Sequence, residues 1–304
     1  MLSSADVKQA ALAVGFDDCG IARADALTDD EYPLHEWLRR GWHGDLAYME
    51  RNADKRMDPR LLVPGAKSVI CLVSAYPPPD SVGGTAAYAR TREYHEDIKK
   101  MLHALLDRLS PLTQSCLSDS ERPATNVEQS NQTIKQSFKL CCDTVPISDK
   151  HWAARAGLGW IGRHTLLVTK RWGSWVNLAE IVTTEECSEY DSDNLSPFTS
   201  HLSPCTSCNR CVAACPNQAL APLTQSSNQA IKQSSNQAIE QSNNQAIKQS
   251  YLLNVTRCTA YYTTHHSRPL PPDVDTRGYT QGCDLCQLAC PFNQKKLYNY
   301  SSCS

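Results

Sequence analysis

The 304-residue sequence lacks a long apolar run, a large excess of charge of either sign and a secretory leader. No apolar stretch reaches the roughly 18 residues that a membrane-spanning helix needs. Lysine and arginine (30) nearly balance aspartate and glutamate (32), and the net charge of −2 gives no global basic signal for nucleic-acid binding. The N-terminal segment MLSSADVKQAALAVGF has neither a basic start nor a small-residue cleavage site. We therefore expect a cytoplasmic protein without a membrane partner.

Cysteine, in contrast, is abundant, with 15 residues. In a secreted chain such a count indicates disulfides, whereas in a cytosolic chain it indicates metal binding. The spacing of the cysteines has to decide between the two, and it favours metal.

Local patterns predict a mixture of helices and strands over the first 185 residues. Apolar spacing and end signals favour helices over 4–15, with Ser4 as the N-cap and Gly15 as the terminator, and over 91–109 and 149–156. Apolar runs of strand length predict strands over 66–76, 138–142, 165–169 and 175–183. We expect an α+β fold with one domain over 1–185 and a cysteine-rich domain over 186–304.

Two polar segments interrupt this organisation, at about 113–137 and about 223–250. The second contains an eight-residue repeat, SSNQAIKQ, SSNQAIEQ, SNNQAIKQ, and the first contains the related string SNQTIKQS. Such tracts bury too little apolar area to offset the entropy of ordering the chain. We interpret both as surface insertions, with a weakly amphipathic helix as the alternative.

Eight cysteines form two related motifs. The first is C-x2-C-x2-C-x3-C-P, and the second is C-x2-C-x3-C-P with one further cysteine upstream. This is the run of bacterial two-cluster ferredoxins, in which the fourth cysteine crosses to the other [4Fe–4S] cluster. The predicted ligands are Cys205, Cys208, Cys211 and Cys290 for one cluster, and Cys215, Cys258, Cys283 and Cys286 for the other. Zinc and disulfides are weaker alternatives, because zinc needs neither the third cysteine nor the trailing prolines.

About 200 residues precede these motifs, which a simple electron carrier does not need. Asp143 follows a predicted strand, and a carboxyl group at a strand end can donate a proton. Gly157, Gly159 and Gly162 allow close backbone approach to a large planar ligand. A turn or cap role for Asp143 is the alternative.

The sequence resembles the cobalamin-dependent epoxyqueuosine reductases of tRNA modification. The resemblance rests on KRMDPRLLVPGAKSVI (55–70), AYARTREYH (87–95), the Asp143 segment with RAGLGWIGRHTLLV (155–168) and GSWVNLAEI (173–181). It continues through PCTSCNRCVAACPNQAL, RCTAYYT and GCDLCQLACPFNQ, and it covers nearly all of the chain outside the two insertions. The chain ends soon after Cys290, as in the short form without C-terminal helical repeats.

The resemblance implies a nitroreductase-like cobalamin-binding domain followed by a ferredoxin-like module. It implies that an external low-potential donor reduces the clusters, that the clusters reduce cob(II)alamin, and that epoxyqueuosine in a tRNA anticodon becomes queuosine. Asp143 matches the proton donor of the family, and we expect a monomer. The implied cofactor contacts are Asp143, Arg56, Gly162, Arg163, His164, Thr165 and Leu167.

The chain departs from the family at Arg163-His164, where Lys-Asn is common, and at Asp149 and His265, where Glu is common. Two other functions stay open on this evidence. One is a different corrinoid-dependent reductase, such as a reductive dehalogenase or a corrinoid activator. The other is an iron–sulfur electron-transfer subunit without catalytic activity.

Overall fold

The computed structural model describes residues 1–28, 32–90, 94–114, 137–194, 205, 207–223, 251–265 and 270–294. The two predicted insertions therefore lie almost wholly outside the described residues. Within these ranges, no helix combines the length and apolar character that crossing a membrane requires.

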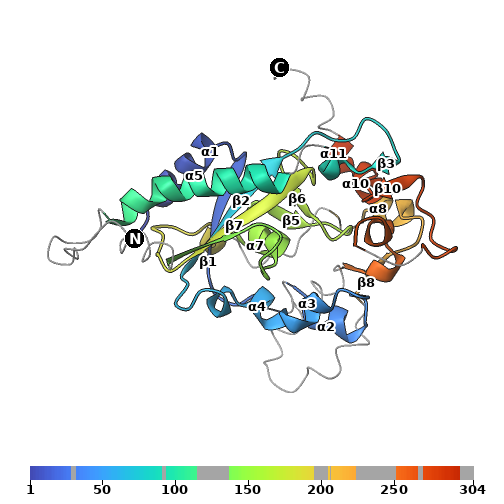
Figure 1. Cartoon of the computed structure of the whole chain (residues 1–304), viewed down its shortest axis with the longest axis horizontal. Helices are drawn as coiled ribbons and strands as arrows, with labels where there is room; N and C mark the ends of the chain where they lie inside the picture. Colours follow the sequence, from blue (N-terminus) through green and yellow to red (C-terminus); the bar gives the residue numbers. More distant parts are fainter. Residues whose placement is uncertain are drawn as a thin grey trace.

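A four-stranded antiparallel sheet forms the centre of the molecule (Figure 1), with strand order β1-β2-β7-β4. Its strands are β1 (Asp18–Arg23), β2 (Ser68–Ala75), β4 (Phe138–Cys141) and β7 (Val176–Thr183). The runs SVICLVSA and VNLAEIVT are rich in β-branched and apolar residues, which suits strands buried on both faces. The sequence predicted these strands but missed β1, whose Gly-containing DCGIAR run gives a weak strand signal.

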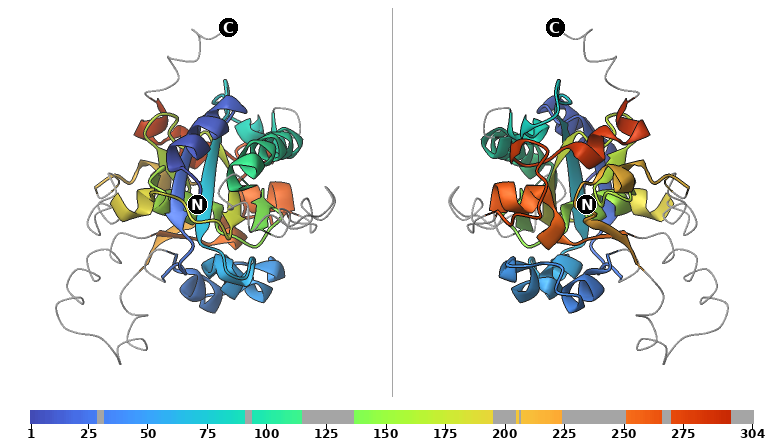
Figure 2. Two further views of the ribbon diagram at one scale, coloured as in Figure 1. Left: turned by 90° about the vertical axis from the view of Figure 1, so that its left-hand side faces the viewer. Right: turned by 90° about the vertical axis from the view of Figure 1, so that its right-hand side faces the viewer.

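Helices cover both faces of the sheet, which confirms the predicted mixture of helices and strands. Figures 1 and 2 place α1 (Ser4–Ala13) and α5 (Tyr94–Gln114) on one side, and α2 (Leu34–Arg39), α3 (Ala47–Arg51) and α4 (Ala53–Met57) on the opposite side. The helix α7 (Asp149–Arg155) also packs on the second face, where Trp152 and Ala153 are fully buried.

The predicted cap of the first helix is wrong by one residue. Ser3 is the N-cap, and its side chain accepts a hydrogen bond from the backbone N–H of Asp6. The Ser4 hydroxyl instead donates to the carbonyl oxygen of Glu189 at 2.7 Å. A serine at the start of a helix can either cap the helix or bond to a residue far away in the sequence. A local sequence pattern does not show whether such a distant partner exists.

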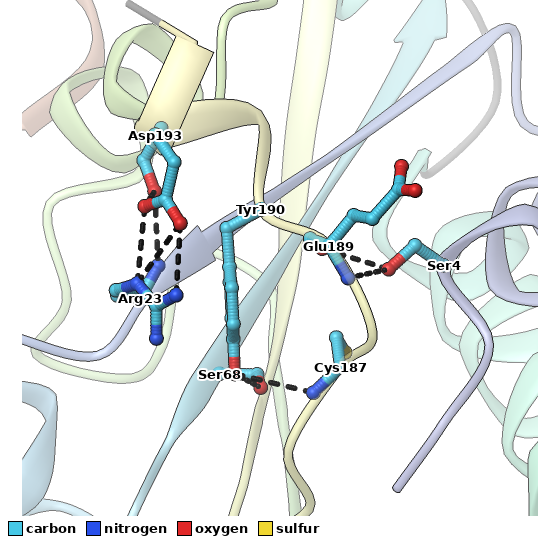
Figure 3. A network of polar contacts seen from close by, with 8 residues as sticks. Ser4, Arg23, Ser68, Cys187, Glu189, Tyr190 and Asp193 are labelled. Carbon is cyan, nitrogen blue, oxygen red and sulfur yellow. Dashed lines mark hydrogen bonds and ion pairs between the residues drawn. The ribbon is translucent and has the colours of Figure 1, made fainter.

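The segment after β7 returns across the sheet and ends in the short helix η3 (Asp191–Asn194). Figure 3 shows the polar contacts that hold it, including an ion pair of 2.8 Å between Arg23 and Asp193. The Tyr190 hydroxyl lies 3.1 Å from the buried Ser68 hydroxyl, and the Arg23 guanidinium stacks over the Tyr190 ring. These contacts close the edge of the sheet at β1.

A small antiparallel hairpin joins β5 (Gly159–Ile161) to β6 (Leu167–Thr169) beside the main sheet. The predicted strand over 165–169 is therefore shorter than expected, because residues 165 and 166 belong to the connecting turn. This turn carries most of the segment that the resemblance assigns to a cofactor.

The cysteine-rich part consists of short elements. They are α8 (Arg210–Ala214), β8 (Leu220–Pro222) paired with β9 (Tyr251–Leu253), η5 (Val255–Arg257), η6 (Tyr261–His265), β10 (Tyr279–Gln281), α10 (Leu285–Leu288) and α11 (Pro291–Gln294). The strand β10 pairs in parallel with β3 (Gly84–Thr85), which belongs to the first part of the chain. The two parts therefore share a strand ladder.

Candidate active site and cysteine module

Asp143 lies just beyond the end of β4, as the sequence predicts. Its backbone has a φ of 53°, in the left-handed region, and its side chain is 43% exposed. The Tyr94 hydroxyl donates a hydrogen bond to its Oδ2, and the same oxygen lies 2.9 Å from His95 Nε2. Both partners come from the start of α5. The carboxyl group is thus held between two side chains that could keep it aimed or exchange a proton with it.

Arg56 comes from α4 and approaches the loop between β4 and α7. Its Nη1 donates to the Ile147 carbonyl oxygen at 3.3 Å, and its guanidinium stacks over the Tyr48 ring at 5.7 Å. It also attracts the Asp149 carboxylate electrostatically. The structure therefore gives Arg56 a local role in ordering this loop.

The turn between β5 and β6 is closed by its own hydrogen bonds. The Thr165 N–H donates to the Gly162 carbonyl oxygen at 2.8 Å, and Thr165 adopts a φ of 65°. Burial lowers the pKa of His164 to about 4, and its neutral Nδ1 accepts from the Leu166 N–H at 3.2 Å. The Lys150 amine donates to the Thr165 carbonyl oxygen at 2.6 Å. The turn is thus tied to the first turn of α7.

Arg163, in the same turn, reaches the cysteine-rich part. Its guanidinium donates to the Asn209 side chain and stacks over the Tyr251 ring at 4.9 Å. Its side chain therefore joins the two parts of the chain, a contact that the sequence did not reveal.

A cavity of about 300 Å³ lies between the two parts of the chain. Its wall is mostly apolar and aromatic with a few amide, hydroxyl and ammonium groups, which is typical of a small-molecule site. The residues that line it are Tyr76, Tyr88, Tyr94, Lys150, Leu166, Leu167, Ser174, Val176, Asn177, Leu178, Ala260, Cys283 and Gln287. The lining thus includes both Tyr94, the partner of Asp143, and Cys283 of the cysteine-rich part.

The eight predicted ligand cysteines lie near one another. Cys211 interacts electrostatically with Cys205, Cys208 and Cys290, and Cys286 interacts with Cys215, Cys258 and Cys283. Cys286 also interacts with Cys211, more strongly than with Cys215, whereas Cys215 is linked to the second group through Cys258 and Cys283. These interactions place the predicted ligands near one another, and their assignment to two clusters stays a prediction. Every cysteine in the described ranges is free of a disulfide.

Buried polar contacts fix the cysteine-rich part against the sheet. Asn293 Oδ1 accepts from the Ser174 N–H at 2.8 Å, and a Cβ at Gly173 would lie 2.1 Å from the same oxygen. Asp284 Oδ2 accepts from the Ala87 N–H at 2.8 Å. These contacts order the walls of the cavity.

Comparison with known proteins gives one consistent result. The family model described as "Epoxyqueuosine reductase QueG, DUF1730" matches residues 56–144. An epoxyqueuosine reductase of Cellulophaga algicola is 32% identical over 294 residues, which cover 95% of this chain and 78% of the relative. The chain belongs to the epoxyqueuosine reductase family. The member from Gloeobacter violaceus is 31% identical and aligns over 96% of this chain and 76% of its own.

Solved structures of epoxyqueuosine reductases share the fold. One crystal structure, of an epoxyqueuosine reductase with an epoxyqueuosine-modified tRNA stem loop, has a TM-score of 0.67 at 24% identity. The structure from Streptococcus thermophilus has a TM-score of 0.65 at 22% identity. This chain covers 65% and 66% of those two chains, slightly less than two thirds of each.

The predicted cofactor contacts lie at different places in the structure. Leu167 lines the cavity, whereas Arg163 contacts the cysteine-rich part and Arg56 contacts the loop before α7. Sequence reasoning singled out neither Tyr94 nor His95 as a partner of Asp143. The string AYARTREYH contained both, but no local pattern could show that the start of α5 meets the end of β4.

Proposed function

We propose that this chain reduces epoxyqueuosine to queuosine at the wobble position of tRNA, with two [4Fe–4S] clusters and cobalamin as cofactors. Membership of the family makes an oxidoreductase the natural expectation. The observation that carries the proposal is the cavity, because a predicted cluster ligand and the tyrosine that binds Asp143 line the same space. A source of electrons and a source of protons would therefore both lie at this cavity.

The overall reaction requires two electrons and two protons. Both carbon–oxygen bonds of the epoxide break, the two carbons become a double bond, and the oxygen leaves as water. An epoxide oxygen is a poor leaving group unless it is protonated, so an acid beside it lowers the barrier. Asp143 is assigned that role, and Tyr94 and His95 hold its Oδ2.

The residues around the cavity suit a corrin. Leu166, Leu167 and the tyrosines would contact its apolar faces, and Asn177 and Lys150 would offer hydrogen bonds to its amide side chains. When bound there, cobalamin would supply a strongly reducing and nucleophilic cobalt centre. The Gly162–Leu167 turn would form part of the wall, and Arg163 would brace this turn against the module.

The cysteine groups would hold the clusters, with Cys215 and Cys290 exchanged between them in a ferredoxin-like module. Among the residues that the structure describes, no three His, Cys, Asp or Glu side chains converge on a point suited to one metal ion. A [4Fe–4S] cube presents its iron atoms at four separate corners, so its four thiolates need not converge in that way. An external low-potential donor, a nitroreductase-like first domain, and a monomeric and cytoplasmic state stay predictions.

The deciding experiment uses the purified chain with both clusters reconstituted and cobalamin added. It is incubated with tRNA from cells that accumulate epoxyqueuosine and with a low-potential reductant, and the nucleosides are analysed by mass spectrometry. Conversion to queuosine is expected. Corrin absorption without conversion would favour a different corrinoid-dependent reductase, and clusters without corrin binding would favour an electron-transfer subunit.

A further inference from the structure

Two carboxyl groups meet inside the molecule, behind the cavity. Glu180 lies in the middle of β7 and is fully buried, and its cross-strand neighbours on β2 and β4 are Cys71 and Cys141. Asp149 is the first residue of α7 and comes within hydrogen-bonding reach of Glu180. The mechanism proposed above uses neither acid.

These carboxyl groups cannot both be ionised in this environment. Glu180 Oε1 and Oε2 and Asp149 Oδ1 are buried and have no hydrogen-bond donor among the residues that the structure describes. An ionised carboxylate only accepts hydrogen bonds, whereas a protonated one donates. One proton placed on either acid therefore creates the hydrogen bond that their geometry offers and removes the repulsion between two close negative charges.

Burial and mutual repulsion act in the same direction. They raise the pKa of Glu180 well above its usual range, and burial raises the pKa of Asp149 to about 6. Burial likewise raises the pKa of Cys71 and Cys141, so both thiols are neutral at neutral pH. The pair thus carries a single negative charge there.

The nearest cation on the same helix is Lys150. Burial lowers the pKa of its amine to about 8, and the charge of Asp149 opposes that shift. Its amine donates to the Thr165 carbonyl oxygen at 2.6 Å, and the residue lines the cavity. The other charged groups that act on the pair are Arg56 from α4 and Asp143 after β4.

We propose that Asp149 and Glu180 share one proton and together act as a single counter-ion for Lys150, which holds the Gly162–Leu167 turn at the cavity wall. The acids are positioning residues, because they act on the turn through Lys150. The importance of the turn rests on the proposed function, but the shared proton and the anchoring of the turn do not.

The arrangement predicts unusual behaviour of amide variants. In Glu180→Gln or Asp149→Asn, the new amide can donate to the remaining carboxyl group, which then ionises. Each single variant keeps one negative charge beside Lys150 and loses only the shared proton. The double variant loses the charge as well, so its effect on the turn must exceed the sum of the single effects.

Infrared spectroscopy of the purified full-length protein tests the shared proton. At pH 7 we expect a carbonyl band of a protonated carboxyl group that shifts in D2O and disappears in both single variants. The exposed Asp97→Asn variant serves as the control and should leave the band unchanged. A band that survives in both single variants, or is missing in the wild type, would overturn the shared proton.

Hydrogen exchange of the 159–169 peptide in the same full-length protein tests the anchoring. Since a hydrogen bond to a charged group contributes at least about 1.5 kcal/mol, we expect exchange about tenfold faster in the double variant and in Lys150→Met. The single variants and Lys150→Arg should match the wild type. Fast exchange in a single variant, or normal exchange in Lys150→Met, would contradict the proposal. A protein that passes both tests but converts no tRNA would refute the proposed function alone.

Discussion

Gly173→Ala is expected to disrupt the contact between the cysteine-rich part and the first part of the chain at the cavity. Gly173 has a φ of 59°, and an added Cβ would lie 2.1 Å from Asn293 Oδ1. Asn293 is 2% exposed, accepts from the Ser174 N–H at 2.8 Å and donates to the Gln287 carbonyl oxygen at 2.7 Å. The added methyl group must therefore displace the buried Asn293 side chain, which joins the first part of the chain to the cysteine-rich part.

The magnitude has two contributions. The left-handed backbone costs an alanine about 1 kcal/mol relative to glycine. Displacing the Asn293 amide leaves buried groups without partners, at about 1–3 kcal/mol. The expected loss in the free energy of unfolding is therefore about 2–4 kcal/mol, together with loss of the wall that carries Ser174 and Gln287.

Gly41→Ala provides a matched control. Gly41 has a similar φ of 65°, but nothing lies within 4 Å of an added Cβ. It should lose only the backbone contribution of about 1 kcal/mol. Denaturant unfolding of both variants with clusters bound measures the difference. Equal destabilisation of the two proteins would refute the role given to Asn293.

Three further predictions concern the acids and the clusters. Asp143→Asn should retain both cofactors yet lose at least about 100-fold in turnover, since an amide cannot supply the proton; single-turnover assays with measured iron and corrin content test this. Cys290→Ser should damage the cluster assigned to Cys205, Cys208 and Cys211. Electron paramagnetic resonance can test this, and damage only to the cluster assigned to Cys258, Cys283 and Cys286 would exclude the crossed assignment. Because the pKa of Asp149 rises from 3.8 to about 6 on folding, the wild type should lose stability as pH increases from about 4 to 6. Urea titrations at pH 4 and pH 6 can measure that loss, and equal stability at the two pH values would contradict it.

Local patterns revealed those parts of the fold that depend on neighbouring residues. The strands β2, β4 and β7 appeared as apolar runs, and α5 appeared from its apolar face, although it extends to Gln114. Cysteine spacing predicts two groups of four ligands, because ferredoxin motifs encode the crossing in their order, and this assignment stays a prediction.

Contacts between distant segments were not predictable in this way. The pairing of Asp143 with Tyr94 and His95 needs α5 to lie beside the end of β4. The acid pair needs the start of α7 to approach β7, a contact that no local pattern reveals. Such contacts follow from the tertiary arrangement, which no single segment specifies.

The parallel ladder between β3 and β10 also has a consequence for the order of assembly. Ala87 and Asp284 are 197 positions apart, yet their hydrogen bond fixes the segment that follows β3. Contacts of such long sequence separation are expected to form late in folding. All strands of the central sheet therefore leave the ribosome before Asp284 does, so the residues that complete the cavity are the last to become available.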